Sequence, residues 1–224
     1  MDESAEAKND HIGILNLQGG IVEHQDHMMR LGVACVPVRR KQDLVGLAGL
    51  IIPGGESTCL GRLIRNAGLD REICEAYEEG LQLWGTCAGA ILLAQHVNND
   101  APHLGLIDIT ISRNAFGSQL ASFHEEIRIP ELAAESIPLT FIRAPKITKV
   151  GSDVTALGRI DDCIIAAETE NILVTVFHPE LTSSLAFHRH FAHKCGLTTD
   201  CDGKSSLIDP HWSPYSWTRQ YQQR

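Results

Sequence analysis

A cysteine between two glycines is the most chemically informative residue of the sequence. Cys87 is the centre of Gly-Thr-Cys-Ala-Gly (85–89), which follows an apolar run and precedes a leucine-rich segment of helical character. This pattern is typical of a nucleophile elbow, in which a strand turns sharply into a helix. The helix N-terminus would favour the thiolate of Cys87 over the thiol. The alternative interpretation is an ordinary buried cysteine, because free cysteine is among the residues most often found inside proteins.

A cysteine nucleophile needs a base, and the base needs a group that orients it. Among the 11 histidines of the chain, His178 is the strongest candidate, because it directly follows an apolar run, at the edge where α/β sheets form their sites. Glu180 lies two residues further on and can accept a hydrogen bond from the imidazole, which fixes its tautomer. Alone, His-x-Glu is more typical of a surface loop. Together with the elbow cysteine it indicates a base and its orienting carboxylate.

Acyl transfer places negative charge on a carbonyl oxygen, and one backbone N–H donor aimed at that charge is worth about 3–4 kcal/mol. Gly54 and Gly55 follow an apolar run and let the backbone turn its N–H groups into a site. The N–H groups of Gly55 and Ala88 are the natural pair of donors. The same glycines also predict a simple turn from strand to helix, and the two interpretations are compatible. Ser57 or Thr58 is expected to cap that helix.

The elements that would hold these residues alternate through the first half of the chain. This order predicts an α/β fold with a mostly parallel central sheet and helices on both faces. Beyond residue 106 the pattern changes to that of an antiparallel portion, with a loop over 113–119, a hairpin over 164–177 and a final helix over 183–194. The expected strands of the first half include 11–16, 33–38 and 49–52, and the expected helices include 21–31, 69–80 and a short piece at 43–47.

Bulk composition limits the classes of function. The chain has 224 residues, 43% of them hydrophobic and 21% charged, which fits one globular domain. Its net charge of −9 argues against binding to nucleic acids or membrane surfaces, which normally use a basic patch. We find no signal peptide or membrane-spanning run, and the seven scattered cysteines indicate free thiols, so we expect a cytoplasmic protein. A zinc site has little support, since no Cys-x-x-Cys pair occurs.

Three separated motifs resemble those of class I glutamine amidotransferases, which use a catalytic triad. Further segments are similar to one branch of that class, the glutaminase subunit family of pyridoxal 5′-phosphate synthase. The resemblance covers about residues 11–195 and is weakest over 120–138. The three motifs are Pro-Gly-Gly-Glu-Ser (53–57), Gly-Thr-Cys-Ala-Gly (85–89) and Phe-His-Pro-Glu (177–180). The further segments are Ile-Gly-Ile-Leu-Asn-Leu-Gln-Gly (12–19), Glu23-His24, Arg-Asn-Ala-Phe-Gly-Ser-Gln (113–119) and Phe-Ile-Arg-Ala-Pro (141–145).

The resemblance implies a flavodoxin-like fold and hydrolysis of L-glutamine to glutamate and ammonia. Cys87 would attack the side-chain amide and form a γ-glutamyl thioester. His178 would protonate the departing ammonia and then activate water, while Glu180 orients the imidazole. Either Arg113 or Arg143 would hold the α-carboxylate of the substrate through its bidentate fork. By family pattern, L-glutamine would contact Gly55, Glu56, Ser57, Arg113, Ile142 and Arg143.

The resemblance also implies a partner. In this family the ammonia passes to a TIM-barrel synthase subunit, which makes pyridoxal phosphate from a pentose phosphate and a triose phosphate and activates the glutaminase on docking. Gln18 would belong to the interface and to its coupling with the oxyanion hole. We expect no cofactor or metal in this chain, since pyridoxal phosphate is the product of the complex.

Two alternatives stay open at this point. One is the glutaminase subunit of another amidotransferase, such as the one that serves histidine biosynthesis, against which the segments 113–119 and 142–145 argue. The other is a catalytically silent interaction subunit of the same fold, against which the three intact triad residue types argue.

Composition divides the chain into three parts. Residues 1–10 form a polar extension, 11–196 the amidotransferase domain, and 197–224 a polar C-terminal extension with four aromatic residues and two prolines. This last segment is expected either to be disordered or to dock its aromatic side chains on the partner or on the domain. The aromatic residues are Trp212, Tyr215, Trp217 and Tyr221.

Overall fold

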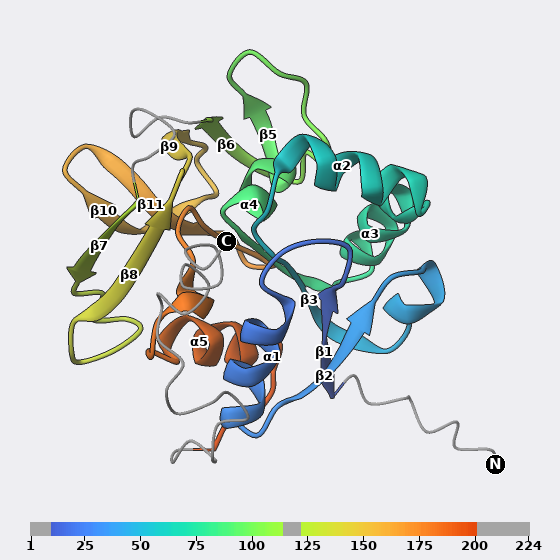
Figure 1. Cartoon of the computed structure of the whole chain (residues 1–224), viewed down its shortest axis with the longest axis horizontal. Coiled ribbons are helices and arrows are strands. Elements are labelled where there is room, and N and C mark those ends of the chain that lie inside the picture. Colours follow the sequence, from blue (N-terminus) through green and yellow to red (C-terminus); the bar gives the residue numbers. More distant parts are fainter. Residues whose placement is uncertain (1–9, 114–121, 201–224) are drawn as a thin grey trace, which may run out of the picture.

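The computed structural model describes residues 10–113 and 122–200 (Figure 1). The helices are α1 (Ile21–Arg30), α2 (Ser57–Asn66), α3 (Leu69–Glu78), α4 (Ala88–Leu93) and α5 (Ala186–Lys194), with short 3-10 helices η1 (Lys41–Leu44) and η2 (Pro179–Leu181). The strands are β1 (His11–Leu15), β2 (Ala34–Val38), β3 (Leu47–Ile52), β4 (Gln82–Thr86), β5 (Ala94–Val97), β6 (Ile107–Ser112), β7 (Ser122–Ile127), β8 (Ile137–Ile142), β9 (Lys146–Val150), β10 (Thr155–Ile160), β11 (Cys163–Glu168) and β12 (Ile172–Thr175).

One large sheet organises the described residues. Its strands follow the order β2-β1-β3-β4-β12-β11-β9-β6-β5, with β10 alongside β11. The run from β2 to β12 is parallel throughout. Helices α1 and α5 lie on one side of this run, and α2 and α3 lie on the other (Figure 1). Because both faces are covered, β3 is buried at every residue and reads as a continuous apolar run. The predicted α/β architecture is therefore confirmed.

The second half of the sheet is mainly antiparallel, as its changed pattern predicted. β11 pairs antiparallel with β12, β9 and β10, and β6 pairs antiparallel with β9. The predicted hairpin is the β11–β12 pair, with Ala166 opposite Thr175. β7 and β8 form a separate antiparallel pair. β9 and β10 were not predicted, because lysine, threonine and arginine at their exposed positions hide the hydrophobic alternation.

Two local predictions were wrong. The N-cap of α2 is Glu56, not Ser57 or Thr58, because the Glu56 carboxylate accepts hydrogen bonds from the N–H groups of Thr58 at 3.0 Å and Cys59 at 2.7 Å. A carboxylate caps two N–H groups at once and favours the positive end of the helix dipole. The short piece expected at 43–47 is instead η1 (Lys41–Leu44), and β3 already begins at Leu47.

The start of the predicted C-terminal extension lies against the domain. Leu197 packs against the core, and the N–H of Asp200 donates to the carbonyl oxygen of Leu31 at 2.9 Å. The four aromatic residues of the extension, most of the loop predicted over 113–119 and nearly all of the N-terminal extension lie outside the described residues. In the described ranges, no helix combines the length and the apolar character needed to cross a membrane.

Candidate active site

The predicted triad and oxyanion residues follow the carboxyl ends of three neighbouring parallel strands, and Gln18 follows a fourth. β1 ends shortly before Gln18, β3 before Gly54, β4 directly before Cys87, and β12 shortly before His178. These strands lie in the order β1-β3-β4-β12, so their carboxyl ends meet at one edge of the sheet. Ligand sites of open α/β sheets form at such an edge. Motifs that are far apart in the sequence thus converge through strand order alone.

Cys87 occupies a strained turn between β4 and α4. Its backbone has φ 47° and ψ −102°, in the positive-φ region that a residue with a side chain rarely adopts. Its N–H donates to the carbonyl oxygen of Thr175 at 2.8 Å, which ties the turn to the end of β12. Strain of this kind persists only where surrounding structure holds it, and it is frequent at functional sites. The predicted nucleophile elbow is the conformation found.

The two glycines of the elbow are required by close packing. A methyl group on Gly85 would lie 2.6 Å from the carbonyl carbon and oxygen of Gly89. One on Gly89 would overlap the carbonyl oxygen of Ile52 in β3. The helix that carries the thiol therefore lies directly against the strands, and neither position has room for a side chain.

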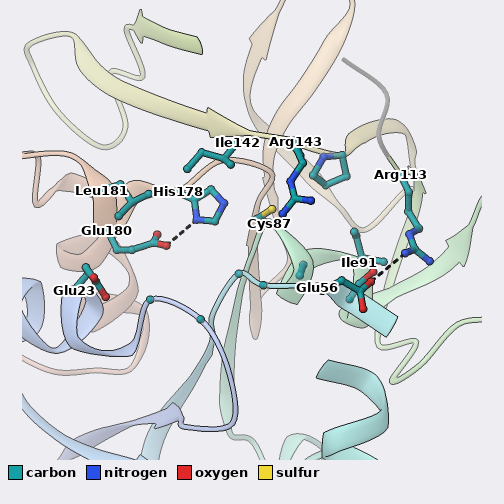
Figure 2. Close-up of a pocket in the computed structure, with 17 residues that line it drawn as sticks. Glu23, Glu56, Cys87, Ile91, Arg113, Ile142, Arg143, His178, Glu180 and Leu181 are labelled. Atoms are coloured by element: carbon teal, nitrogen blue, oxygen red, sulfur yellow. Dashed lines mark hydrogen bonds and ion pairs between the residues drawn. The ribbon is translucent and has the colours of Figure 1, made fainter. Parts of the chain in front are cut away.

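His178 and Glu180 form the second part of the site. Their side chains are joined by a hydrogen bond of 2.8 Å between Nδ1 of His178 and Oε1 of Glu180 (Figure 2). The N–H of His178 donates to the carbonyl oxygen of Thr140 in β8 at 2.8 Å, and Pro179 begins η2 directly after it. The Glu180 side chain is 1% exposed and that of His178 is 13% exposed. The carboxylate is thus buried behind the imidazole, which faces the cavity and Cys87 (Figure 2).

Charge interactions at this pair outweigh the effect of burial. Burial by itself lowers the pKa of His178, but Cys87 and Glu180 overcome it and raise that pKa well above 6.5. Burial by itself raises the pKa of Glu180, but His178 and His24 bring it down to about 2. A charged imidazolium beside an ionised carboxylate is therefore the favoured state of the pair near neutral pH.

The glycine turn after β3 lies against the side chains of His178 and Cys87. A methyl group on Gly54 would lie 2.5 Å from Cε1 of His178 and 3.3 Å from Cβ of Cys87. One on Gly55 would lie 3.0 Å from Oε1 of Gln18, and that oxygen accepts the N–H of Glu56 at 3.3 Å. The Gln18 side chain therefore contacts the turn that carries one of the predicted oxyanion donors.

A single cavity of about 380 Å³ collects most of the predicted residues. Its size and its mixture of apolar and polar walls suit a small polar molecule. Figure 2 shows Arg143 extending into it above Cys87, with Glu56 and Arg113 at the opposite side from Glu180. Of the predicted residues, Gly55, Glu56, Ser57, Cys87, Ala88, Arg113, Ile142, Arg143, His178 and Glu180 line the cavity.

Arg113 is held at the rim by two carboxylates. Its Nη1 lies 2.7 Å from Oδ2 of Asp100, and its Nη2 lies 3.4 Å from Oε1 of Glu56 and 3.2 Å from Oγ1 of Thr58. Arg143 has a positive φ of 47° and, in the described part of the chain, forms no ion pair. The two candidate arginines therefore differ: carboxylates fix the guanidinium of Arg113, whereas that of Arg143 extends into the cavity without an ion pair to the described residues.

Sequence reasoning missed several residues of the site. Gly19, Gly20 and Glu23 line the cavity, and Asp100 anchors Arg113 from a turn that carried no recognisable motif. Glu23 and His24 belong to a segment that resembles the family, but the sequence indicated no role for them, although both residues lie close to Glu180. The described residues hold no group of three or more His, Cys, Asp or Glu side chains arranged for a metal ion.

The fold and this grouping define an α/β enzyme that presents a cysteine on a nucleophile elbow. The sequence matches the SNO glutamine amidotransferase family over residues 14–197, and the chain belongs to that family. It is 54% identical to the pyridoxal 5′-phosphate synthase subunit PdxT of Syntrophus aciditrophicus, over 96% of each chain. It is 46% identical to the PdxT protein of Clostridium kluyveri, over 82% of this chain and 98% of the relative.

Solved structures agree with this assignment. A crystal structure described as a glutamine amidotransferase superposes with a TM-score of 0.78 at 41% identity and covers 83% of this chain and 98% of its own. The match to the Syntrophus relative leaves out only about 4% of this chain, so it includes most of the segment after residue 196. That segment therefore has a counterpart in at least one member of the family.

Proposed function

We propose that the protein is the glutaminase subunit of a pyridoxal 5′-phosphate synthase. It hydrolyses L-glutamine to L-glutamate and ammonia, and it delivers the ammonia to the synthase subunit for vitamin B6 biosynthesis. The observation that carries this proposal is one cavity lined by Cys87, His178 and Glu180, in a chain 54% identical to a PdxT protein.

In the first half-reaction, the Cys87 thiolate attacks the side-chain carbonyl carbon of glutamine. The carbonyl oxygen becomes negatively charged, and the N–H groups of Gly55 and Ala88 stabilise it. The C–N bond then breaks, and the His178 imidazolium gives its proton to the departing amine, so that ammonia leaves and a γ-glutamyl thioester remains on Cys87. The raised pKa of His178 supports this step, because it keeps the imidazole protonated until the leaving group needs the proton.

In the second half-reaction, His178 is neutral and acts as the base. It removes a proton from water as the water oxygen attacks the thioester carbonyl carbon, and the C–S bond breaks to release glutamate and the Cys87 thiolate. Glu180 accepts the Nδ1–H of His178 throughout, so Nε2 is the nitrogen that exchanges protons. The protons balance over the cycle, since water supplies both the hydroxyl of glutamate and the proton carried by ammonia.

The recognition residues lie around the opposite side of the cavity. Gly55, Glu56, Ser57 and Ile142 contact the substrate, while Arg113 or Arg143 holds its α-carboxylate. A guanidinium fork matches a carboxylate in two parallel hydrogen bonds. Gln18 couples the docking of the synthase subunit to the oxyanion donors, a role supported by its contact with the turn at Gly55. Residues 11–196 act as the amidotransferase domain.

Replacement of the nucleophile tests the proposal. Cys87→Ala is expected to reduce glutamine hydrolysis at least about 10³-fold, as for the loss of other triad nucleophiles, while the variant still co-purifies with the synthase subunit. Cys74→Ala is the matched control, because this half-buried cysteine on α3 lies outside the cavity lining and its loss should leave the rate unchanged. Hydrolysis by Cys87→Ala close to the unaltered rate would refute the nucleophile assignment.

The partner is tested by adding it. Glutaminase activity is expected to rise when the TIM-barrel synthase subunit is present. An enzyme that is fully active alone and indifferent to that subunit would instead serve another amidotransferase.

A further inference from the structure

The second oxygen of Glu180 faces another buried histidine. Oε1 accepts the hydrogen bond from His178, while Oε2 lies 3.5 Å from Nε2 of His24 on α1. Both side chains are at most 1% exposed. In the described part of the chain, neither Oε2 of Glu180 nor Nε2 of His24 has a hydrogen-bond partner. Each atom is therefore free to bond the other. The separation exceeds that of a formed hydrogen bond by only a few tenths of an ångström.

A third histidine fixes the other side of the His24 ring. Nδ1 of His24 lies 2.9 Å from Nε2 of His188 on α5, and His188 is fully buried. The ring of Trp84 packs edge-on against both imidazoles, with centroid separations of 5.5 Å to His24 and 4.8 Å to His188. The position of His24 is therefore set by two helices and a strand, independently of Glu180.

Counting protons assigns the direction of each hydrogen bond. Burial lowers the pKa of His24 to about 4 and that of His188 well below 6.5, so each ring carries one proton near neutral pH. If His188 donates from Nε2 to Nδ1 of His24, then Nε2–H of His24 points at Glu180, and Nδ1 of His188 is a bare acceptor. Of the two ring nitrogens of His188, Nδ1 is indeed the one that has no partner among the described residues. The reverse assignment sets a lone pair of His24 against the carboxylate and leaves a buried N–H of His188 unpaired.

We propose that His24 is a positioning residue of the catalytic set: its Nε2–H holds the second oxygen of Glu180, and His188 fixes the tautomer that allows this. The series of interacting side chains then extends from Cys87 through His178 and Glu180 to His24 and His188. This proposal rests on the proposed glutaminase function and deepens it. His24 does not line the cavity and touches no substrate, so it acts only through Glu180.

The expected consequence follows from the charge on Glu180. Its carboxylate interacts with His178, His24 and His27, and with the half-buried Glu23, whose own charge disfavours another carboxylate nearby. Without the donor from His24, protonation of Glu180 becomes easier and its orientation toward His178 is less fixed. The rate of the chemical steps should fall, the acid limb of the pH profile should move to higher pH, and KM should stay the same.

Three variants, measured in complex with the synthase subunit, test this. His24→Leu removes both nitrogens and is expected to lower kcat about 10–100-fold, the usual loss for a hydrogen bond to a charged group, with KM within twofold and the acid limb raised by about one pH unit. His24→Gln keeps an amide N–H that can reach Oε2 and should recover most of the rate. His27→Gln is the matched control, since His27 is buried on the same helix and its ring also packs against His188, at a centroid separation of 4.4 Å, but its nitrogens bond the backbone carbonyls of Glu23 and Thr182 and not Glu180. It should leave the acid limb unmoved.

The proposal is overturned if His24→Leu keeps kcat within twofold of the unaltered chain, if His24→Gln is as impaired as His24→Leu, or if His27→Gln moves the acid limb equally. Nitrogen-15 NMR of histidines in the unaltered chain provides a measurement that needs no variant. Nε2–H tautomers are expected for His24 and His188 at pH 7, and a Nδ1–H tautomer at His24 would contradict the assignment.

A readout without glutamine separates this proposal from the proposed function. Alkylation of Cys87 by iodoacetamide, followed by peptide mapping, reports how the His178–Glu180 pair supports the thiolate at each pH. The acid limb of alkylation is expected to rise in His24→Leu but not in His27→Gln. If that shift occurs while the unaltered complex hydrolyses no glutamine, the positioning role stands and the glutaminase function fails. If hydrolysis is normal and the alkylation profile of His24→Leu is unchanged, the positioning role alone fails.

Discussion

Two walls of the cavity differ in how far their charged side chains are exposed to water. The catalytic wall is formed by Cys87, His178 and Glu180, and the recognition wall by Glu56 and Arg113 with Asp100 behind them. On the catalytic wall, the Glu180 side chain is 1% exposed and that of His178 is 13% exposed, and both are fixed by backbone and buried partners. On the recognition wall, the side chains of Arg113, Glu56 and Asp100 are 30%, 50% and 38% exposed and are held by one another. Charges that must stabilise a transition state gain from a dry, preorganised setting. Charges that must admit and release a polar substrate need contact with water.

This contrast predicts different failures on the two walls. A change on the catalytic wall should lower kcat, because the side chains there have no alternative positions. A change on the recognition wall should raise KM, because binding is lost while the reacting groups stay in place.

Among variants that keep Cys87, His178 and Glu180, the largest effect is expected at Gly54. In Gly54→Ala, the added methyl would lie 2.5 Å from Cε1 of His178 and 3.3 Å from Cβ of Cys87, so the imidazole must leave its present position beside Cys87 or the turn must shift. A displacement of about 1 Å in a catalytic group can reduce the rate about 10²-fold, so we expect kcat to fall at least that far in steady-state assays. Gly46→Ala is the control, because its methyl meets nothing within 4 Å and its positive φ affects only stability. A kcat for Gly54→Ala within threefold of the unaltered enzyme would show that the catalytic wall is less rigid than the contacts imply.

The next effect concerns stability toward acid. The pKa of buried His24 is about 4 in the folded chain against about 6.5 when unfolded, so between these values the unfolded chain binds a proton that the native chain does not. The free energy of unfolding should therefore fall as the pH drops from 6.5 to 4, by about 3 kcal/mol from His24 alone. His27 and His188, which face His24 and also have lowered pKa values, add to the loss, while Glu180 opposes it by attracting a proton to His24.

Urea unfolding followed by circular dichroism at several pH values measures this dependence. His24→Leu should flatten the slope by about one proton between pH 4 and 6.5. Below pH 4.5 a second loss is expected, because the depressed pKa of Glu180 stabilises the fold only while the carboxylate is ionised. Above neutral pH the sign reverses: the raised pKa of His178 stabilises the fold below pH 6.5, and this contribution is lost as the pH rises through that raised value. An unchanged acid slope in His24→Leu would show that His24 does not carry this sensitivity and would leave it to His27 and His188.

The difference between the two walls also explains which site residues could be predicted from the sequence. The catalytic wall was predictable because Cys87 directly follows one buried strand, His178 and Glu180 follow another within a few residues, and neighbouring parallel strands bring their ends together. The anchoring of Arg113 by Asp100 was not, since it joins two exposed turns through side chains that any polar loop contains. His24 and His188 were also hidden, because a histidine on an amphipathic helix reads as surface until packing of α1 against α5 buries it. The cap at Glu56 was missed because serine and threonine stood beside it.

The smallest effects should come from the recognition wall. Arg113→Ala is expected to raise KM for glutamine about 10–100-fold with kcat within threefold, the loss for charge-assisted hydrogen bonds to one carboxylate. We expect the larger effect from Arg113 rather than from Arg143, because Asp100 and Glu56 already hold the Arg113 guanidinium and less side-chain freedom is lost on binding. Asp100→Ala, which leaves the arginine but removes its anchor, should raise KM only about 2–5-fold, the usual range for a partly exposed ion pair. If Arg143→Ala raises KM more than Arg113→Ala does, the carboxylate belongs to Arg143, and preorganisation by surface ion pairs does not decide recognition on this wall.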